Sequence, residues 1–208
     1  GYTSADPKEV RTYIYHNSFK NQYACGIYLN NQEDAVVEEN EISTYSSYGW
    51  FKGIYCLRAK DDLRISKNWI HGQHGGYGIW LYNCYGNAED QYVVNNFVQV
   101  GGRSSSSSVG IEIYNSEDIN VYFNTVNQTS SQGGDKAFWL NGTNAQIRVK
   151  NNIFANTGGG YAIFAQYAAS AGFSSCDYND LYTSGSYVGK YGGFSFSTLA
   201  NWSSSTGW

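Results

Sequence analysis

The chain repeats a short segment in which apolar residues flank an asparagine, and this repeat constrains its fold more than any other feature. Residues 63–70 are one copy, with Asn68 between Ile65 and Ile70. The asparagines of the seven copies are Asn17, Asn40, Asn68, Asn96, Asn124, Asn152 and Asn179. Their spacings are 23, 28, 28, 28, 28 and 27 residues. A nearly constant period in this range predicts a solenoid in which each repeat is one coil.

Each repeat also carries a small residue followed by an apolar, a variable and a second apolar residue. The copies begin at Gly26, Gly53, Gly78, Gly110, Ala137 and Ala162. Alternation with a period of two predicts a β-strand with one buried face. We expect each coil to hold this strand, a turn, a second strand that ends before the asparagine, a bend and a short third strand. Because one coil cannot bury its own apolar face, the stacked coils should share one core.

The repeated asparagines are interpreted as structural residues and not as ligands. Asparagine tolerates the left-handed backbone conformation that a tight bend requires. When asparagines stack in register, their side-chain amides also form hydrogen bonds along the stack. The sequence therefore predicts an asparagine ladder at one corner of the solenoid.

The composition agrees with a solenoid built from strands and turns. Charged residues make up 14% of the chain, which contains 24 glycines, 20 tyrosines and a single proline. This combination favours turn-rich β structure over helices. The predicted fold class is all-β, a single-stranded parallel β-helix of about seven coils of 23–28 residues. Residues 1–181 are assigned to the β-helix, with 1–11 either capping its start or continuing an upstream coil. Residues 182–208 are assigned to a tail that caps the other end, since an uncovered end would expose strand edges.

The cysteines are expected to be free thiols. They are Cys25, Cys56, Cys84 and Cys176, and their even number permits disulfides. In the aligned repeats, however, Cys25 lies opposite Lys52. Cys56 lies opposite Leu29 and Leu81. The spacing does not suit a metal site either. No cofactor is predicted, and Ca²⁺ is the one ion left open, although no calcium-binding motif is present.

The charge and hydropathy patterns exclude some classes of partner. The net charge of −4 gives no sign of the basic surface that nucleic-acid binding requires. No apolar run is long enough to span a membrane, and the start does not resemble a signal peptide. The chain begins at Gly1 and contains no methionine. We therefore expect a processed form or an excised part of a longer chain, monomeric as a fragment.

The two repeated motifs, over about residues 12–181, resemble the right-handed parallel β-helix proteins of the pectate-lyase-like superfamily. The segment that runs from Asp177-Tyr178-Asn179-Asp180-Leu181-Tyr182 through Phe194 to Thr198-Leu199-Ala200-Asn201-Trp202 resembles the ends of β-helix regions in large secreted proteins of Bacteroidetes-type bacteria. The resemblance implies right-handed coils, an extracellular or cell-surface location and membership of a larger multidomain chain. It also implies work on polysaccharides by lyases, hydrolases or epimerases, or a role in adhesion. A fold alone does not decide between these functions.

An aromatic column is expected on the outer face of the Gly-Ile strands. The first outward position reads Tyr28, Tyr55, Trp80, Glu112, Trp139 and Phe164. An exposed aromatic row often marks a binding surface, because sugar rings stack on aromatic faces through their C–H bonds. The predicted substrate-binding residues are Tyr28, Tyr55, Trp80, Tyr82, Trp139, Asn141 and Phe164. The alternative is that the aromatic rings pair across the strands and stabilise the sheet.

A candidate catalytic cluster surrounds Glu112, which interrupts the column. The loops entering the neighbouring coils carry His74, Arg103 and Lys136. A β-elimination lyase needs a cation to neutralise a uronic carboxylate and a base for the C5 proton. Arg103 or Lys136 would neutralise the carboxylate, and His74 or Tyr114 would act as base.

No second carboxylate lies beside Glu112 in the outward columns, which disfavours a paired-carboxylate glycosidase. If the protein is an enzyme, a polysaccharide lyase is therefore favoured. The same residues would otherwise contact a sugar without catalysis or form ordinary surface. The leading hypothesis is an extracellular polysaccharide-recognition module. The alternative is a structural or adhesive stalk segment of a larger cell-surface protein with no ligand of its own.

Overall fold

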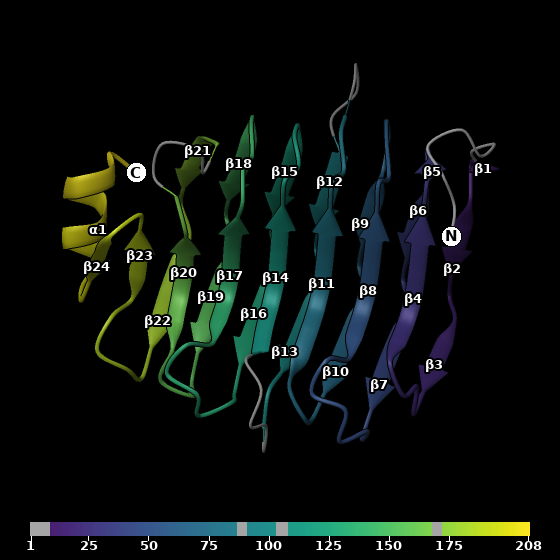
Figure 1. Ribbon diagram of the computed structural model, residues 1–208, viewed down its shortest axis with the longest axis horizontal. Helices are drawn as coiled ribbons and strands as arrows, with labels where there is room; N and C mark the ends of the chain where they lie inside the picture. Colours follow the sequence, from purple (N-terminus) through teal and green to yellow (C-terminus); the bar gives the residue numbers. More distant parts are fainter. Residues whose placement is uncertain (1–8, 87–90, 103–107, 168–171) are drawn as a thin grey trace.

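The computed structural model describes residues 9–86, 91–102, 108–167 and 172–208. They form three parallel β-sheets that wrap around one core and run side by side along the long axis (Figure 1). This arrangement confirms the predicted all-β parallel solenoid. The stack amounts to about six turns, and sheets II and III each contain seven strands, one for each of the seven asparagine copies.

Sheet I contains the Gly-Ile strands and lies on the near side in Figure 1. Its strands are β4 (Cys25–Asn30), β8 (Lys52–Leu57), β11 (Gly76–Tyr82), β14 (Ser108–Tyr114), β17 (Lys136–Asn141), β20 (Tyr161–Ala165), β23 (Gly189–Tyr191) and β24 (Phe194–Phe196). Sheet II contains the strands that precede the ladder asparagines. They are β2 (Tyr13–Tyr15), β6 (Val36–Glu38), β9 (Arg64–Ser66), β12 (Gln91–Val94), β15 (Ile119–Tyr122), β18 (Ile147–Lys150) and β21 (Phe173–Asp177).

Sheet III contains the strands that follow the ladder asparagines. They are β3 (Ser18–Lys20), β7 (Glu41–Thr44), β10 (Trp69–Gly72), β13 (Phe97–Val100), β16 (Thr125–Gln128), β19 (Ile153–Asn156) and β22 (Asp180–Thr183). Two short strands, β1 (Glu9–Val10) and β5 (Gln32–Glu33), pair outside these sheets. All neighbouring strands in the three sheets are parallel except β23 and β24.

The core consists of columns of apolar side chains that stack from coil to coil. In sheet I, Ile54 is paired with Ile79, and Ile79 with Ile111. The column continues through Phe138 to Ile163. All five side chains are fully buried. Each coil thus covers the apolar face of the next, as the repeat predicts.

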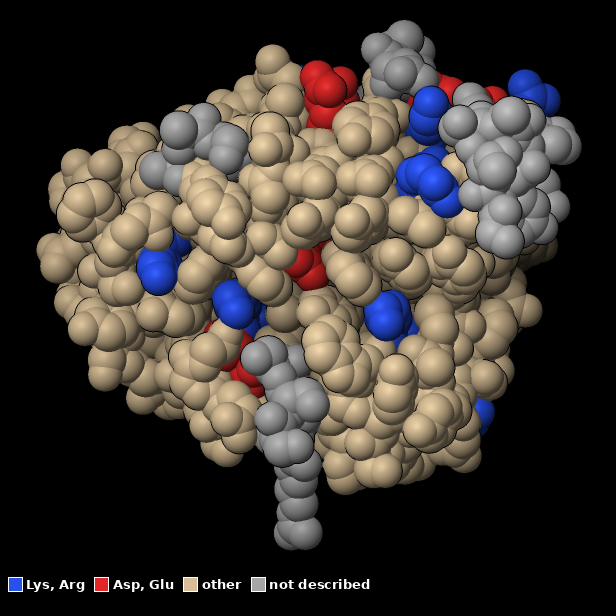
Figure 2. Space-filling view, in the orientation of Figure 1, with Lys and Arg blue, Asp and Glu red and all other residues tan. Residues whose placement is uncertain are grey.

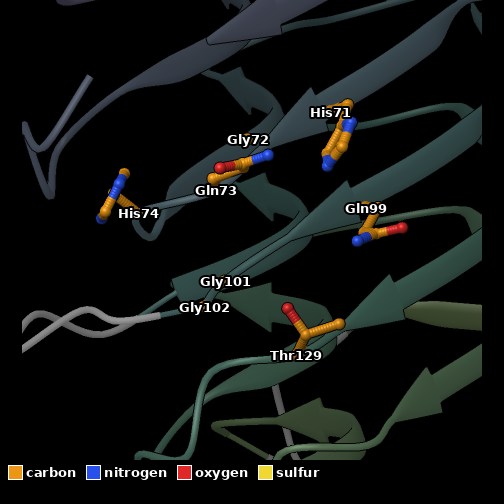
Figure 3. Close-up of a pocket in the computed structure, with 8 residues that line it drawn as sticks. All are labelled: His71, Gly72, Gln73, His74, Gln99, Gly101, Gly102 and Thr129. Carbon is orange, nitrogen blue, oxygen red and sulfur yellow. The ribbon is translucent and has the colours of Figure 1, made fainter. Parts of the chain in front are cut away.

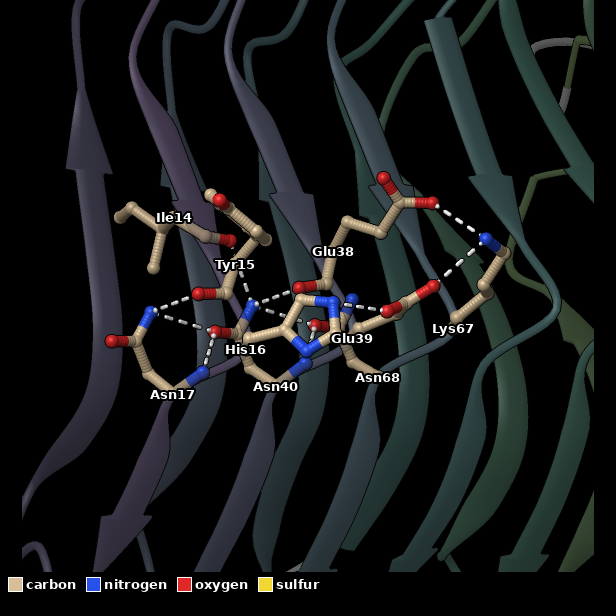
Figure 4. A network of polar contacts seen from close by, with 9 residues as sticks. All are labelled: Ile14, Tyr15, His16, Asn17, Glu38, Glu39, Asn40, Lys67 and Asn68. Atoms are coloured by element: carbon tan, nitrogen blue, oxygen red, sulfur yellow. Dashed lines mark hydrogen bonds and ion pairs between the residues drawn. The ribbon is translucent and has the colours of Figure 1, made fainter.

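The predicted asparagine ladder is present at the corner between sheets II and III (Figure 4). The side-chain amide of Asn40 donates to Oδ1 of Asn68 at 3.0 Å, and the backbone N–H of Asn40 donates to the same oxygen at 3.1 Å. The pattern repeats along all seven asparagines, with side-chain N–O distances of 2.9–3.1 Å. Beside it, Lys67 forms ion pairs with Glu38 and Glu39 on the solvent side. The ladder therefore satisfies buried polar groups at a point where the chain turns sharply.

The expectation that the ladder asparagines themselves adopt the left-handed backbone conformation was wrong. The positive φ angles occur one residue earlier, for example 54° at Lys67 and 55° at Phe123. The residues at this corner position are His16, Glu39, Lys67, Asn95, Phe123, Asn151 and Tyr178. Because the preceding residue makes the bend, the asparagine side chain can point inward and form hydrogen bonds.

The four cysteines are free thiols, as predicted. Cys25 is paired with Lys52, and Cys56 lies between Leu29 and Leu81 in register. Burial raises the pKa of the Cys84 thiol to about 12. The buried thiols therefore behave as small apolar side chains within the stack.

The C-terminal end of the stack is covered by β24 and by helix α1 (Leu199–Thr206), which lies across it in Figure 1. Trp202 in α1 is fully buried, and its ring lies 5.8 Å from the ring of Phe196. At the other end, most of the predicted cap over residues 1–11 lies outside the described residues.

Removal of the N-cap of α1 should weaken the cover at this end. The side chain of Thr198 accepts a hydrogen bond from the backbone N–H of Asn201 at 3.1 Å. We expect Thr198→Ala to lower the free energy of unfolding of the cap by about 1 kcal/mol. Hydrogen exchange of the α1 amides measures this change. Ser205→Ala is the matched control at an exposed helical position, and equal protection in both variants would contradict the capping role.

Candidate functional site

The outer face of sheet I carries the predicted aromatic column in register. Tyr28 is paired with Tyr55, Tyr55 with Trp80, and Trp80 with Glu112. The column then continues through Trp139 and Phe164. Figure 2 shows this face as mostly uncharged, with an acidic group in a depression near the middle and basic groups on either side.

A second outward column lies one step earlier along the strands, at the position before each glycine or alanine of the Gly-Ile motif. Lys52 is paired with Tyr77, and Val109 with Lys136. The glycine interrupts the alternation because it faces inward. A Cβ atom on Gly78 would lie 2.2 Å from Cγ1 of Val98. The preceding side chain therefore points outward, and Lys136, which the sequence placed in a loop, is the first residue of β17.

The N-terminal half of the aromatic column stacks on itself. The rings of Tyr28 and Tyr55 lie 5.0 Å apart at 18°, and those of Tyr55 and Trp80 lie 4.8 Å apart at 23°. Tyr77 also stacks on Trp80, with ring centres 4.7 Å apart. Because these rings contact one another face to face, this half of the column stabilises the sheet.

The centre of the face is Glu112, whose side chain is buried. The residue is 1% exposed and lies in register between Trp80 and Trp139. Its Oε1 accepts a hydrogen bond from Nδ2 of Asn141 at 2.8 Å, whereas Oε2 is buried with no partner among the described residues. Burial raises the pKa of Glu112 to about 7, although Asn141 and Lys136 act in the opposite direction. The carboxyl group can therefore donate or accept a proton near neutral pH.

Lys136 lies beside this carboxyl group and is itself nearly buried. Its Nζ donates to the carbonyl oxygen of Gly134 at 2.5 Å and lies 4.2 Å from the centre of the Trp139 ring. Burial lowers the pKa of Lys136, and the nearby carboxylates of Asp135 and Glu112 partly restore it. Lys136 is thus a cation held close to both Glu112 and Trp139.

Several polar atoms at this centre are left without partners. Within the described part of the chain, Nε1 of Trp80, Nε1 of Trp139 and Oε2 of Glu112 are buried and form no hydrogen bond with protein. A buried polar atom without a partner costs free energy. An ordered water molecule or a bound polar ligand would supply the partner that each of these atoms lacks.

A hollow adjoins this centre and shares two of its residues, Trp139 and Asn141. Its volume is about 640 Å³, within the range of roughly 300–1,000 Å³ that is typical of ligand pockets. The lining residues are Tyr114, Asn115, Trp139, Asn141, Gly142, Thr143, Gln166 and Tyr167. The lining thus combines aromatic rings with amide and hydroxyl groups.

The remaining predicted residues occupy different places. Tyr82 stacks on Tyr114 with ring centres 4.7 Å apart. Phe164 meets the ring of Trp139 edge to face. His74 lines a different hollow, together with residues of sheet III, and Arg103 lies outside the described residues. The structure therefore brings together Glu112, Tyr114 and Lys136 of the proposed catalytic cluster, but does not place His74 in the same hollow.

Three residues of this surface, Lys52, Tyr77 and Tyr167, were not predicted from the sequence. The first two could have been found from the position that precedes each glycine of the repeat. Among the described residues, no group of three or more His, Cys, Asp or Glu side chains could hold a metal ion. Within the described residues, no helix is long and apolar enough to cross a membrane, and α1 has only eight residues.

The repeat region matches a known protein family. The family described as "Right handed beta helix region" matches residues 3–126. The chain belongs to this right-handed β-helix family. Searches of curated proteins and of solved structures found no match. In this right-handed β-helix, the family match covers Trp80 and Glu112, and the strands that carry Trp139 and Phe164 continue the same register beyond it.

Proposed function

We propose that this right-handed β-helix is a polysaccharide-recognition module that binds a glycan chain along the outer face of sheet I. The observation that carries the proposal is Glu112, a buried carboxyl group with one unsatisfied oxygen beside a hollow of about 640 Å³. A ligand with hydroxyl groups would give Oε2 a partner and could also accept from the indole N–H groups of Trp80 and Trp139.

The lining of the hollow suits a sugar ring in two ways. The rings of Trp139 and Tyr167 supply apolar surface for the C–H bonds of a pyranose. Asn141 and Gln166 supply amides, and Thr143 a hydroxyl group, for the sugar hydroxyls. Sites that combine apolar walls with a few placed polar groups are typical of small-molecule recognition.

Location and wider context form part of the same proposal. The resemblance of the repeat to the pectate-lyase-like superfamily supports an extracellular or cell-surface module. It also supports a place for the module within a larger multidomain chain. A glycan of the surrounding matrix or of another cell would then be the partner.

Lyase chemistry is a separate hypothesis. The ammonium group of Lys136 is already bonded to the carbonyl oxygen of Gly134 and lies against the ring of Trp139, which favours binding over elimination. The decisive assay is the absorbance of unsaturated uronides during incubation with pectate, alginate or glycosaminoglycans. An absorbance rise that is lost in Lys136→Ala would assign elimination to this site.

A structural stalk is the alternative function, and one observation favours it. The rings of Tyr28, Tyr55 and Trp80 stack on one another. Cross-strand pairs of this kind stabilise a sheet without any ligand. Under this alternative the protein has no glycan ligand, and the polar atoms around Glu112 bind only water.

A glycan array with the wild-type protein and Trp139→Ala tests the proposal. Loss of an aromatic anchor at the centre of a binding surface typically costs about 2 kcal/mol or more. We therefore expect retention of the bound glycan to fall by at least about tenfold in Trp139→Ala.

Tyr92→Ala is the matched control, because Tyr92 is a half-buried aromatic residue on sheet II in the central part of the stack. It should retain the glycan as the wild type does. The proposal fails if the folded wild-type protein retains no glycan, or if Trp139→Ala and Tyr92→Ala behave alike.

A further inference from the structure

We propose a second ligand site on the outer face of sheet III, built to hold a single neutral pyranose unit. It is a hollow of about 460 Å³. Figure 3 shows the residues that line it, which are His71, Gly72, Gln73, His74, Gln99, Gly101, Gly102 and Thr129. These residues include none of those assigned to the sheet I surface, so the second site does not depend on the first.

Neighbouring coils supply one wall of this hollow. His71 in β10 is paired in register with Gln99 in β13, and Thr129 directly follows β16. Neighbouring strands lie about 4.8 Å apart, so the His71 and Gln99 side chains form a short row along the axis. This spacing matches the separation of hydroxyl groups across one sugar ring.

Two glycines hold the loops that form the opposite wall. Gly101 and Gly102 have φ angles of 120° and 100°, which side-chain-bearing residues rarely adopt. A Cβ atom on Gly102 would lie 2.1 Å from the carbonyl oxygen of Gln73. His74 and Gly102 form an antiparallel bridge. The loops that follow β10 and β13 are therefore fixed against each other.

The polar side chains of the hollow are available to a ligand. Within the described part of the protein, the side chains of His71, Gln73, His74 and Gln99 form no hydrogen bond. Only Thr129 is engaged, through a hydrogen bond from its hydroxyl group to the carbonyl oxygen of Val100 at 3.3 Å. Together these groups offer both donors and acceptors, as sugar hydroxyls require.

The chemistry of the lining points to a neutral ligand. No Asp, Glu, Lys or Arg is among the described lining residues. Aromatic surface adjoins the polar groups. Trp69 is 50% exposed and its ring lies 6.4 Å from that of His71 at 29°, and Phe97 is 44% exposed. Trp69 and Phe97 are paired in register on the same face. The apolar face of a pyranose can therefore rest on these rings while its hydroxyls reach the amides and imidazoles.

The experiment uses the three histidines of the chain, His16, His71 and His74, as reporters. Their imidazole resonances are followed by NMR in the whole chain at one fixed pH. The probes are methyl glucoside, methyl galactoside, methyl mannoside and methyl xyloside, with sodium glucuronate as a charged comparison.

We expect at least one neutral glycoside to shift the resonances of His71 and His74 in a saturable way. His16 is bonded to Glu39 at the ladder corner and should not move. Gln99→Ala should abolish the shifts, whereas Trp139→Ala should leave them unchanged. This last variant separates the second site from the site on sheet I.

Three results would overturn the assignment. The first is that no neutral glycoside moves either His71 or His74. The second is that glucuronate alone moves them, which would indicate an anion site. The third is that the shifts persist in Gln99→Ala, with the remaining resonances showing an intact fold.

Discussion

Replacement of Asn68 by valine is expected to lower the free energy of unfolding by about 4 kcal/mol. Oδ1 of Asn68 accepts from the backbone N–H and the side-chain amide of Asn40. Nδ2 of Asn68 donates to Oδ1 of Asn96 at 3.0 Å and to the carbonyl oxygen of Val37 at 2.9 Å. Because Asn68 is only 1% exposed, water cannot easily replace these partners, and each buried group left unsatisfied costs about 1–3 kcal/mol.

Urea unfolding of Asn68→Val measures this loss, and Asn127→Val is the matched control. Asn127 lies on the outer face of sheet III, where its side chain accepts one exposed hydrogen bond from Thr157. Its replacement should cost less than about 1 kcal/mol. Equal destabilisation of both variants would show that the ladder does not stabilise the stack more than a surface hydrogen bond does. Loss of glycan binding in a stably folded Asn68→Val protein would show that the wrong face is assigned to the ligand.

Glu112→Gln should stabilise the protein above neutral pH. The pKa of Glu112 is about 7 in the folded protein, whereas 4.5 is the reference value for the unfolded chain. Between these values the folded state binds more protons than the unfolded state, so this group makes stability fall as pH rises from about 4.5 to about 7. The difference in pKa corresponds to about 3 kcal/mol. Glutamine carries no charge, so Glu112→Gln should have a free energy of unfolding about 3 kcal/mol higher than the wild type above pH 7. Below pH 4.5 the two proteins should be equally stable.

The measurement is the difference in the free energy of unfolding between the wild type and Glu112→Gln across this pH range. Use of the difference cancels the contributions of other titrating groups, such as Asp135, whose pKa burial also raises. Glu117→Gln, which removes a carboxyl group at an exposed position, is the matched control. A flat difference for Glu112→Gln would mean that the carboxyl group is solvated, and would remove the main support for a ligand at this position.

The fold could be predicted from the sequence because each structural position is repeated in successive coils. The seven asparagines define the period, and the Gly-Ile motif defines the register of sheet I, so Trp80, Glu112 and Trp139 were placed in one column. The backbone conformation at the corner was assigned one residue too late. The pattern marks the asparagine, but the bend is made by the preceding residue, whose identity varies from Lys67 to Phe123.

The details of the site could be predicted only in part, because they depend on side chains from several coils. The burial of Glu112 follows from Trp80 on one side and from Trp139 and Lys136 on the other. The face-to-face stacking of Tyr28 and Tyr55 depends on their rotamers, which periodicity does not specify. The inward-facing glycine shifts Lys52, Tyr77 and Lys136 to the outer face, and strict alternation does not predict that shift. His74 was grouped with Glu112 because both belong to neighbouring coils, but the loop after β10 places it beside sheet III.

The most direct test of the glycan site is an NMR titration of the indole N–H groups with the glycan that the array retains best. The chain contains six tryptophans, each with one such signal. Occupation of the centre at Glu112 should shift the signals of Trp80 and Trp139, whose indole N–H groups have no hydrogen-bond partner in the described part of the protein. The signal of Trp202, which is buried on the inner side of the cap helix α1, should not move. Binding that leaves Trp80 and Trp139 unchanged, or the absence of any binding by the folded protein, would contradict a ligand site on sheet I.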